Sequence, residues 1–294
     1  MTNDFKTRKS SYQKPQLSPE EWKEKKQTEK DAVYKMIDDT ALSVVQDAEK
    51  FKDFLDTQAR LDRYSSANVL LIYNQYPQAT QLKDFNDWAQ EKASVRRGAK
   101  SISILEPVEY TKSDGLPGIS YSVKKVFDVS QTNSKQTLPA APNLESKKLA
   151  AILIAASPVN VEASNELPNP QMAAFYNNDK QTLYIKRGIS DITELCQNLA
   201  REIGHAQLAD NDGTYIRSDS AFRAECVGYM LCKKYGVDTK NFDIERIPDE
   251  WKNKEPKEIR AELTKIRIAM TEIHSCVFEK SYRQTQIRSK EQER

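Results

Sequence analysis

The residues with the clearest chemical potential form the pentapeptide Arg201-Glu202-Ile203-Gly204-His205. Zinc peptidases carry His-Glu-x-x-His on a helix, where the two histidines bind zinc and the glutamate acts as general base on the metal-bound water. This chain keeps the glutamate and the second histidine, but an arginine stands where the first histidine would be needed. The pentapeptide is therefore a zinc motif in which one ligand has been replaced.

The replacement matters because a catalytic zinc ion needs three protein ligands and an open position for water. Candidates for a further ligand are Glu225, about one helix further along the chain, and Asp219, near the start of that helix. His205 and Glu225 alone would bind zinc weakly, and a guanidinium at the first position stays protonated. We therefore expect no cofactor, or at most weakly bound zinc, and an ion pair from Arg201 to Glu225 or Asp219. Glu202 is catalytic only if the site is active.

Bulk composition limits the classes of protein to which the chain can belong. Its 294 residues suggest two domains, or one domain with tails, and its net charge of +2 confines any nucleic-acid surface to a local patch. No apolar run approaches the ~18 residues of a membrane span, and residues 1–10 lack the apolar core of a secretory signal. The four cysteines are scattered, which favours reduced thiols. We expect a cytoplasmic protein without a membrane partner.

The first half of the chain reads as a helical domain that follows a polar arm. Residues 1–28 are expected to be disordered, although Ser18 and Pro19 could begin a short helix as N-cap and first helical residue. Residues 29–130 combine helices with a β-hairpin or small antiparallel sheet, and residues 131–147 form a linker. The expected helices cover about 30–62, 66–75 and 84–91, and the expected strands cover about 102–108 and 119–127.

The second half, residues 148–285, is expected to be a further α+β domain, which makes the whole chain α+β. A hairpin should join strands at about 173–176 and 182–186, the latter as an edge strand, because Asn177-Asn178-Asp179-Lys180 between them is good turn chemistry. Two packed helices should follow, at about 191–209 and 218–235, the second capped by Gly236. A last helix covers about 256–280, and residues 286–294 form a charged tail.

Both halves resemble ArdC-type antirestriction proteins of plasmids and conjugative elements. The resemblance covers about residues 30–285 and consists of several motifs in the right order. In the first half the matching residues are 63–72, 77–80, 88, 95–100, 102, 104–108, 126–132 and 138–139. In the second half they are 200–205, 223–229 and 236–239. The chain departs from the family pattern at two positions. Arg201 stands where the family has the first histidine of the motif, and Arg223 stands where the family has an acidic residue.

The resemblance implies a single-stranded-DNA-binding domain followed by a metallopeptidase-like domain. The local chemistry of the first half fits such a role, because cationic grooves bind phosphates and exposed aromatic rings stack with bases. Gly98 also allows the backbone to approach a phosphate. The candidate DNA-binding residues are Arg63, Tyr64, Ser65, Asn68, Trp88, Arg96, Arg97 and Lys100. These residues also have structural alternatives: Trp88 could belong to the core, Ser65 could cap a helix, and Tyr64 lies at a helix junction and could serve either role. The basic cluster could be only a solvated turn.

Three functions remain open from the sequence. The first is a single-stranded-DNA-binding accessory protein of a mobile element, antirestriction-like, whose peptidase-like domain has lost catalysis. The second is an active zinc metallopeptidase that uses Glu202 as base, with His205, Glu225 and another ligand such as Asp219. The third is a protein-binding module that acts as a decoy for a host restriction or defence protein.

Overall fold

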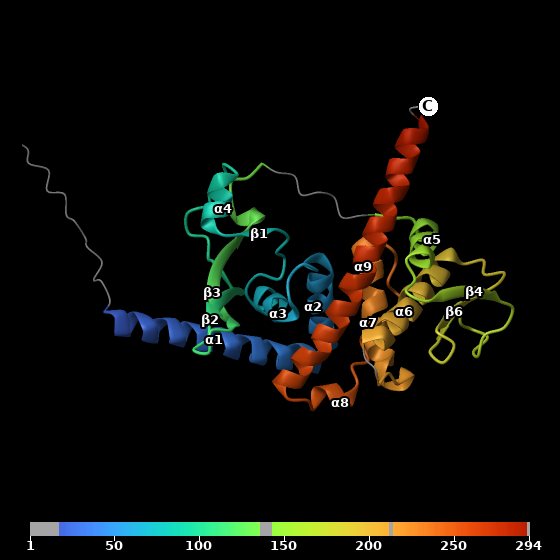
Figure 1. Cartoon of the computed structure of the whole chain (residues 1–294), viewed down its shortest axis with the longest axis horizontal. Coiled ribbons are helices and arrows are strands. Elements are labelled where there is room, and N and C mark those ends of the chain that lie inside the picture. The colour runs from blue at the N-terminus through green and yellow to red at the C-terminus, as the bar shows by residue number, and fades with distance from the viewer. Residues whose placement is uncertain (1–17, 136–142, 212–213, 293–294) are drawn as a thin grey trace, which may run out of the picture.

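A computed structural model describes residues 18–135, 143–211 and 214–292. The described chain is mainly helical, with two small sheets that lie at opposite ends of the molecule (Figure 1). This arrangement confirms the predicted α+β class. Among the described residues, no helix is both long enough and apolar enough to cross a membrane.

Helix α1 (Pro19–Gln46) begins inside the segment that was expected to be a disordered arm. Ser18 and Glu21 form a capping box, in which each side chain accepts a hydrogen bond from the other residue's backbone N–H, and Pro19 occupies the first helical turn. The expected arm therefore extended too far along the chain, while residues 1–17 lie outside the described part. The first buried residue of α1 is Val33, so its leading turns project into solvent.

The helix expected over residues 30–62 is two helices. Asp47 separates α1 from α2 (Ala48–Arg60), with extended backbone angles (φ −137°, ψ 119°) and a side chain that accepts a hydrogen bond from the Lys50 N–H. A free N–H at a helix start is stabilised in this way by an aspartate cap. The break turns α2 and the following α3 (Ser66–Gln75) back against α1.

The N-terminal sheet contains β1 (Leu82–Lys83), β2 (Ile102–Thr111) and β3 (Pro117–Asp128), all antiparallel in the order β1-β3-β2. The short helix α4 (Phe85–Gln90) follows β1. At the open edge of β2, two amide side chains of α3 replace a neighbouring strand. Asn68 bonds both backbone groups of Leu105, and Gln75 bonds both backbone groups of Ser103, at 2.8–3.0 Å. These four bonds attach the hairpin to the helical layer.

The C-terminal sheet follows α5 (Ser146–Ala155) and contains β4 (Asn160–Ser164), β5 (Ala174–Asn177) and β6 (Thr182–Lys186). Strands β5 and β6 form the predicted antiparallel hairpin. The expectation that residues 182–186 form an edge strand was wrong: β6 is the central strand because β4 pairs with its other side in parallel.

Helices α6 (Ile192–Asn211) and α7 (Arg217–Tyr235) pack closely against each other beside this sheet. Two glycines make the approach possible. A Cβ atom on Gly228 would lie 3.0 Å from the Arg201 backbone nitrogen, and one on Gly204 would lie 3.2 Å from the Val227 side chain. Gly236 ends α7 in the left-handed conformation (φ 75°), as predicted. The glycines thus determine how near the residues on facing sides of α6 and α7 can come.

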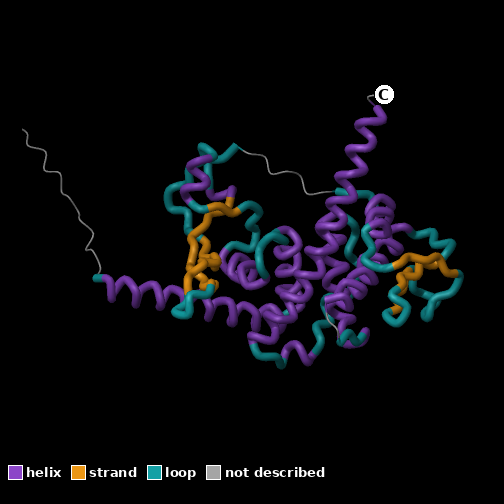
Figure 2. The backbone as a smooth tube through the Cα atoms, in the orientation of Figure 1, coloured by secondary structure: helices purple, strands orange, loops and turns teal. Residues whose placement is uncertain are grey.

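The chain ends with α8 (Asp249–Lys252) and the long α9 (Pro256–Gln292), so the residues expected to form a charged tail continue the helix as far as Gln292. Helices from both halves surround α9 and share one hydrophobic core. The tube in Figure 2 shows the helices gathered between the two groups of strands. The predicted linker, of which residues 136–142 lie outside the described part, therefore joins halves that are packed together.

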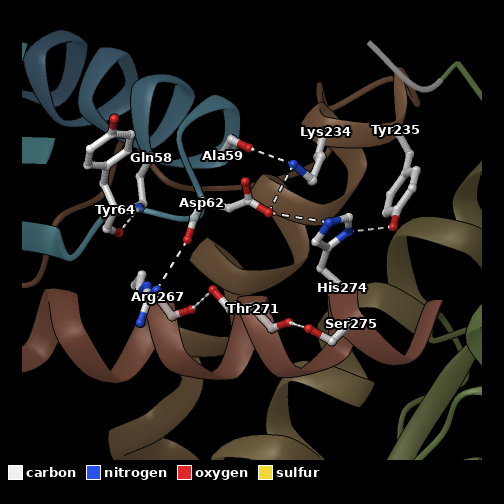
Figure 3. Close-up of polar contacts among 10 residues, drawn as sticks. All are labelled: Gln58, Ala59, Asp62, Tyr64, Lys234, Tyr235, Arg267, Thr271, His274 and Ser275. Atoms are coloured by element: carbon white, nitrogen blue, oxygen red, sulfur yellow. Dashed lines mark hydrogen bonds and ion pairs between the residues drawn. The ribbon is translucent and has the colours of Figure 1, made fainter. Parts of the chain in front are cut away.

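A polar cluster around Asp62 links the two halves (Figure 3). Its carboxylate lies 3.1 Å from Lys234 Nζ on α7 and 3.3 Å from His274 Nε2 on α9, and the Tyr235 hydroxyl lies 2.7 Å from His274 Nδ1. Arg267 of α9 donates a hydrogen bond to the Asp62 carbonyl. The end of α2 is thereby attached to both C-terminal helices.

Candidate functional site

The zinc-like pentapeptide lies in the middle of α6, facing α7 and the edge strand β5. Arg201 and His205 are four residues apart, so their side chains leave the same face of the helix. Glu225 on α7 meets this face because the glycine contacts bring the two helices together. The sequence-predicted residues Arg201, Glu202, His205 and Glu225 therefore do come together.

Arg201 forms an ion pair with Glu225, as expected from the sequence. The distance between Arg201 Nε and Glu225 Oε2 is 2.6 Å, although the N–H is not aligned for a hydrogen bond. The other carboxylate oxygen accepts a hydrogen bond from the Asp243 N–H at 2.8 Å. Burial raises the pKa of Glu225, and the neighbouring guanidinium opposes that rise. The arginine thus supplies the positive charge that this partly buried carboxylate needs.

Glu202 is completely buried and fully engaged. Its carboxylate accepts a hydrogen bond from the Tyr176 N–H of β5 at 2.7 Å, and Arg217 Nη2 contacts both of its oxygens, at 2.7 and 3.0 Å. Arg217 also donates to the Tyr176 carbonyl and lies over the Phe175 ring. Both carboxylate oxygens of Glu202 are therefore occupied by donors, in a charge-assisted pair that removal of either partner would break.

His205 is buried beside these charges and is neutral. Burial, followed by the positive charges of Arg217 and Arg201, lowers the pKa of its imidazole to about 3. Its Nδ1 lies 2.8 Å from the Tyr215 hydroxyl, and burial raises the pKa of that hydroxyl to about 12. The imidazole therefore carries no charge at neutral pH and is oriented by a hydrogen bond.

The residues of this site do not fit a divalent cation. A guanidinium occupies the first ligand position, the Glu225 carboxylate is already paired with it, and a second arginine holds Glu202. Across the described ranges of the chain, no group of three or more histidine, cysteine, aspartate or glutamate side chains converges as a metal site. Asp219, the alternative ligand, is solvent-exposed and accepts a hydrogen bond from the Ser218 hydroxyl.

Sequence reasoning missed Arg217, Tyr215 and Tyr176. Tyr215 lies in the connection between α6 and α7, and Arg217 is the first residue of α7. Helical spacing therefore gives no indication that these two residues approach α6. Tyr176 acts through its backbone, which has no sequence signature. The sequence offered one signal for the pair: the helix after the one that carries Glu202 begins with an arginine, Arg217, that no local motif requires.

The candidate phosphate-binding residues form a basic turn, defined here as Arg96, Arg97, Gly98 and Lys100. Gly98 has φ 85°, a conformation that favours glycine, and the Ala99 N–H bonds to the Arg96 carbonyl to close the turn. The Arg96 N–H donates to the Gln131 carbonyl, and the Gln131 side chain donates to the Lys100 carbonyl, so the turn is fixed to the short 3-10 helix (Val129–Gln131) that follows β3. The three cationic side chains are exposed, and no ion pair engages them in the part of the chain that the structure describes.

The other candidate DNA-binding residues divide into accessible and structural ones. The prediction that Trp88 forms a stacking platform was wrong, because its indole is fully buried and donates a hydrogen bond to the Phe127 carbonyl. Asn68 is committed to the β2 edge, and Ser65 caps α3 by accepting a hydrogen bond from the Asn68 N–H. Arg63 is exposed, and Tyr64 is half-buried, with its hydroxyl 3.4 Å from the Leu82 carbonyl.

Fold and site together define an α+β protein in which a helix-and-hairpin unit is packed against a helix pair with an arginine-filled, zinc-like motif. A family model described as the N-terminal domain of anti-restriction factor ArdC matches residues 20–141. The metal-free crystal structure of the antirestriction ArdC protein from the R388 plasmid is similar in fold, with a TM-score of 0.51 and 17% identity over 74% of this chain and 86% of that one. Its Mn(II)-bound form gives a TM-score of 0.50 and 16% identity over 73% and 85%.

These matches identify residues 20–141 as an ArdC-type N-terminal domain and show that the fold of the chain is similar to that of the R388 protein, which confirms the resemblance carried by the sequence motifs. No curated protein matches its sequence.

Proposed function

We propose that this ArdC-type chain is an antirestriction protein that binds single-stranded DNA through residues 29–130, and that its peptidase-like half has lost catalysis. The family match supports the antirestriction role, since both the matching family and the similar R388 protein are described as antirestriction factors. Its partners would be single-stranded DNA and, through the antirestriction role, a host restriction or defence protein. A cytoplasmic location would suit both partners.

The basic turn is the observation that carries the DNA-binding proposal. Arg96, Arg97 and Lys100 present three exposed charges around a glycine turn whose backbone is fixed by Gln131. Such a rigid cationic turn binds phosphates without reading sequence. Because the net charge of the whole chain is only +2, binding should be moderate and should weaken steeply with salt.

The proposed loss of catalysis rests on the two arginines of the zinc-like site. Arg201 stands at the first ligand position and pairs with Glu225, while Arg217 holds the Glu202 carboxylate. A general base must bring a carboxylate oxygen within hydrogen-bond reach of the attacking water, and both oxygens of Glu202 are buried and bonded to Arg217 or to the Tyr176 N–H. The second half then serves as a scaffold on which the first half packs.

Fluorescence anisotropy with single- and double-stranded oligonucleotides at two salt concentrations tests the DNA-binding proposal. The wild type should prefer the single strand. The double variant Arg96→Glu/Arg97→Glu should bind at least tenfold more weakly, and its log–log salt slope should be smaller by about 1.4, since each phosphate contact on a single strand contributes roughly 0.7. Unchanged affinity of the variant at low salt would exclude the basic turn as the binding surface.

A protein-binding module is the second candidate, favoured by the outer half of the β2–β3 hairpin. This half exposes the large apolar side chains Val108, Tyr110, Leu116, Ile119 and Tyr121. The strand register places Val108 and Tyr110 on one face of the hairpin and Ile119 and Tyr121 on the other, so both faces expose apolar side chains of the kind found at protein interfaces. An absence of oligonucleotide binding by the wild type would favour this reading, and chelator-sensitive proteolysis that Glu202→Gln abolishes would favour an active metallopeptidase.

A further inference from the structure

A pocket of about 350 Å³ lies between the N-terminal end of α3, the β1–α4 segment and the β2–β3 hairpin. One face of the hairpin forms its floor, because Ile104, Glu106, Lys124 and Val126 occupy alternating positions on adjacent strands. Its volume falls within the range of small-molecule sites in proteins, about 300–1,000 Å³. The pocket therefore has room for a ring system and the atoms attached to it.

Hydrogen bonds to the backbone position the residues that form the walls of the pocket. Tyr64 lines one side, its carbonyl held by the Gln58 side chain (Figure 3) and its hydroxyl placed 3.4 Å from the Leu82 carbonyl across the end of the pocket. Asn68 beside it is fixed by both backbone groups of Leu105. On the opposite side, Asp84 caps α4. A pocket with such fixed walls needs little ordering when a ligand enters.

A hydrogen-bond donor and an acceptor stand side by side on the floor. Lys124 Nζ lies 2.8 Å from Glu106 Oε1 and 3.2 Å from Asp84 Oδ2. Its contacts with Glu106 and Asp84 raise the pKa of Lys124, and the N–H groups at the start of α4 lower the pKa of Asp84, so both side chains are charged at neutral pH. The pocket thus offers a cationic donor next to carboxylate acceptors, beside the apolar side chains of Ile104 and Val126 on the same floor.

The charged side chains of the pocket disfavour two simple ligands, a phosphate and a metal cation. The pocket contains three carboxylates, Asp84, Asp87 and Glu106, against the two lysines Lys83 and Lys124, so a phosphate would be repelled. A metal cation would have to displace the ammonium group of Lys124 from between its carboxylates. A flat, neutral ring with its own donor and acceptor meets neither obstacle.

We propose that this pocket takes one nucleobase of the bound single strand, preferentially a base that presents an exocyclic amino group beside a ring-nitrogen acceptor. Glu106 accepts from the amino group and Lys124 donates to the acceptor, while the Tyr64 ring and the apolar side chains of Ile104 and Val126 contact the base. Cytosine and adenine have this pattern, whereas thymine has no amino group. The inference rests on the proposed DNA-binding function and adds a base subsite to it.

Anisotropy titrations with the homopolymers dC20 and dT20 at pH 7.5 test the subsite in the full-length chain. The wild type should bind dC20 about three- to tenfold more tightly than dT20. Glu106→Gln should reduce this preference below twofold, and Tyr64→Leu should weaken binding of both strands about threefold or more. Glu109→Gln is the matched control, because Glu109 is an exposed glutamate on the same strand outside the pocket and reports the general effect of removing one negative charge.

The outcomes separate the subsite from the proposed function. Equal affinities for dC20 and dT20 that neither pocket variant alters, together with weakened binding by Arg96→Glu/Arg97→Glu, would overturn the subsite and leave the DNA-binding proposal intact. No binding of either strand by the wild type would overturn both. If free deoxycytidine binds as tightly as dC20, the pocket takes a free nucleoside, and the proposal that its base comes from the bound strand is overturned.

Discussion

Replacing Arg201 by histidine should convert the arginine-filled site into a zinc site. The substitution restores His-Glu-x-x-His and supplies three ligands, which are the new imidazole, His205 and Glu225. The Nε2 atom of a histidine lies as many bonds from Cα as the Nε atom of an arginine, and Arg201 Nε is 2.6 Å from Glu225 Oε2. The Tyr215 contact occupies His205 Nδ1 and leaves Nε2 for the metal.

The size of the effect follows from this geometry. A tetrahedral zinc ion separates a nitrogen and an oxygen ligand by roughly 3.4 Å, so the facing side chains need to move apart by less than about 1 Å. At a free zinc concentration of about 100 times Kd, binding stabilises the folded state by about 2.7 kcal/mol. At roughly 2–4 °C per kcal/mol, the melting temperature should rise by about 5–10 °C.

Thermal unfolding with and without zinc, together with metal analysis after dialysis, measures this gain. Arg201→Gln is the matched control, because it also breaks the pair with Glu225 but supplies no ligand. Zinc should raise the melting temperature of Arg201→His alone. The reasoning is refuted if Arg201→His responds to zinc no more than Arg201→Gln does, or if the wild type already retains one tightly bound zinc ion per chain.

Three further substitutions test other parts of the structure by urea unfolding. His205→Gln should make the free energy of unfolding less sensitive to acid. In the wild type the imidazole has a pKa of about 3 when folded and about 6.5 when unfolded, so the free energy of unfolding falls as the pH drops below about 6.5, by about 2 kcal/mol at pH 5. An unchanged pH profile in the variant would contradict this. Asn68→Ala should cost about 2–3 kcal/mol, because both backbone groups of Leu105 lose their partner; a loss below about 0.5 kcal/mol would leave the amide without a structural role. Gly228→Ala should cost about 1–3 kcal/mol, because its Cβ would press on the Arg201 backbone, and a neutral effect would show that α6 and α7 can separate freely.

The helix pair α6–α7 could be predicted from the sequence because its signals are local. An apolar stripe and the αL glycine at position 236 determine where the second helix runs and ends. The same holds for the two hairpins, whose turn residues lie between apolar strands. The break at Asp47 was missed because one extended residue barely disturbs the apolar spacing on either side.

Contacts between distant segments could not be predicted in this way. The pairing of β4 with β6 depends on how the chain returns after α5, and no residue spacing encodes it. The partner of Glu202 comes from the start of α7, and its other partner is a backbone N–H. For Trp88 the sequence left both a stacking platform and a core position open, because a short amphipathic helix does not reveal which of its faces the strand β3 will cover.

The polar cluster around Asp62 bears on the mechanics of the molecule. Because Asp62 joins α2 to both α7 and α9, and because one hydrophobic core runs through both halves, we expect the two halves to unfold together as a single cooperative unit. Covalent continuity between residues 135 and 143 is then dispensable once folding is complete. Two fragments produced by a cut there would stay associated as a complementing pair, and neither would be expected to hold its native fold alone.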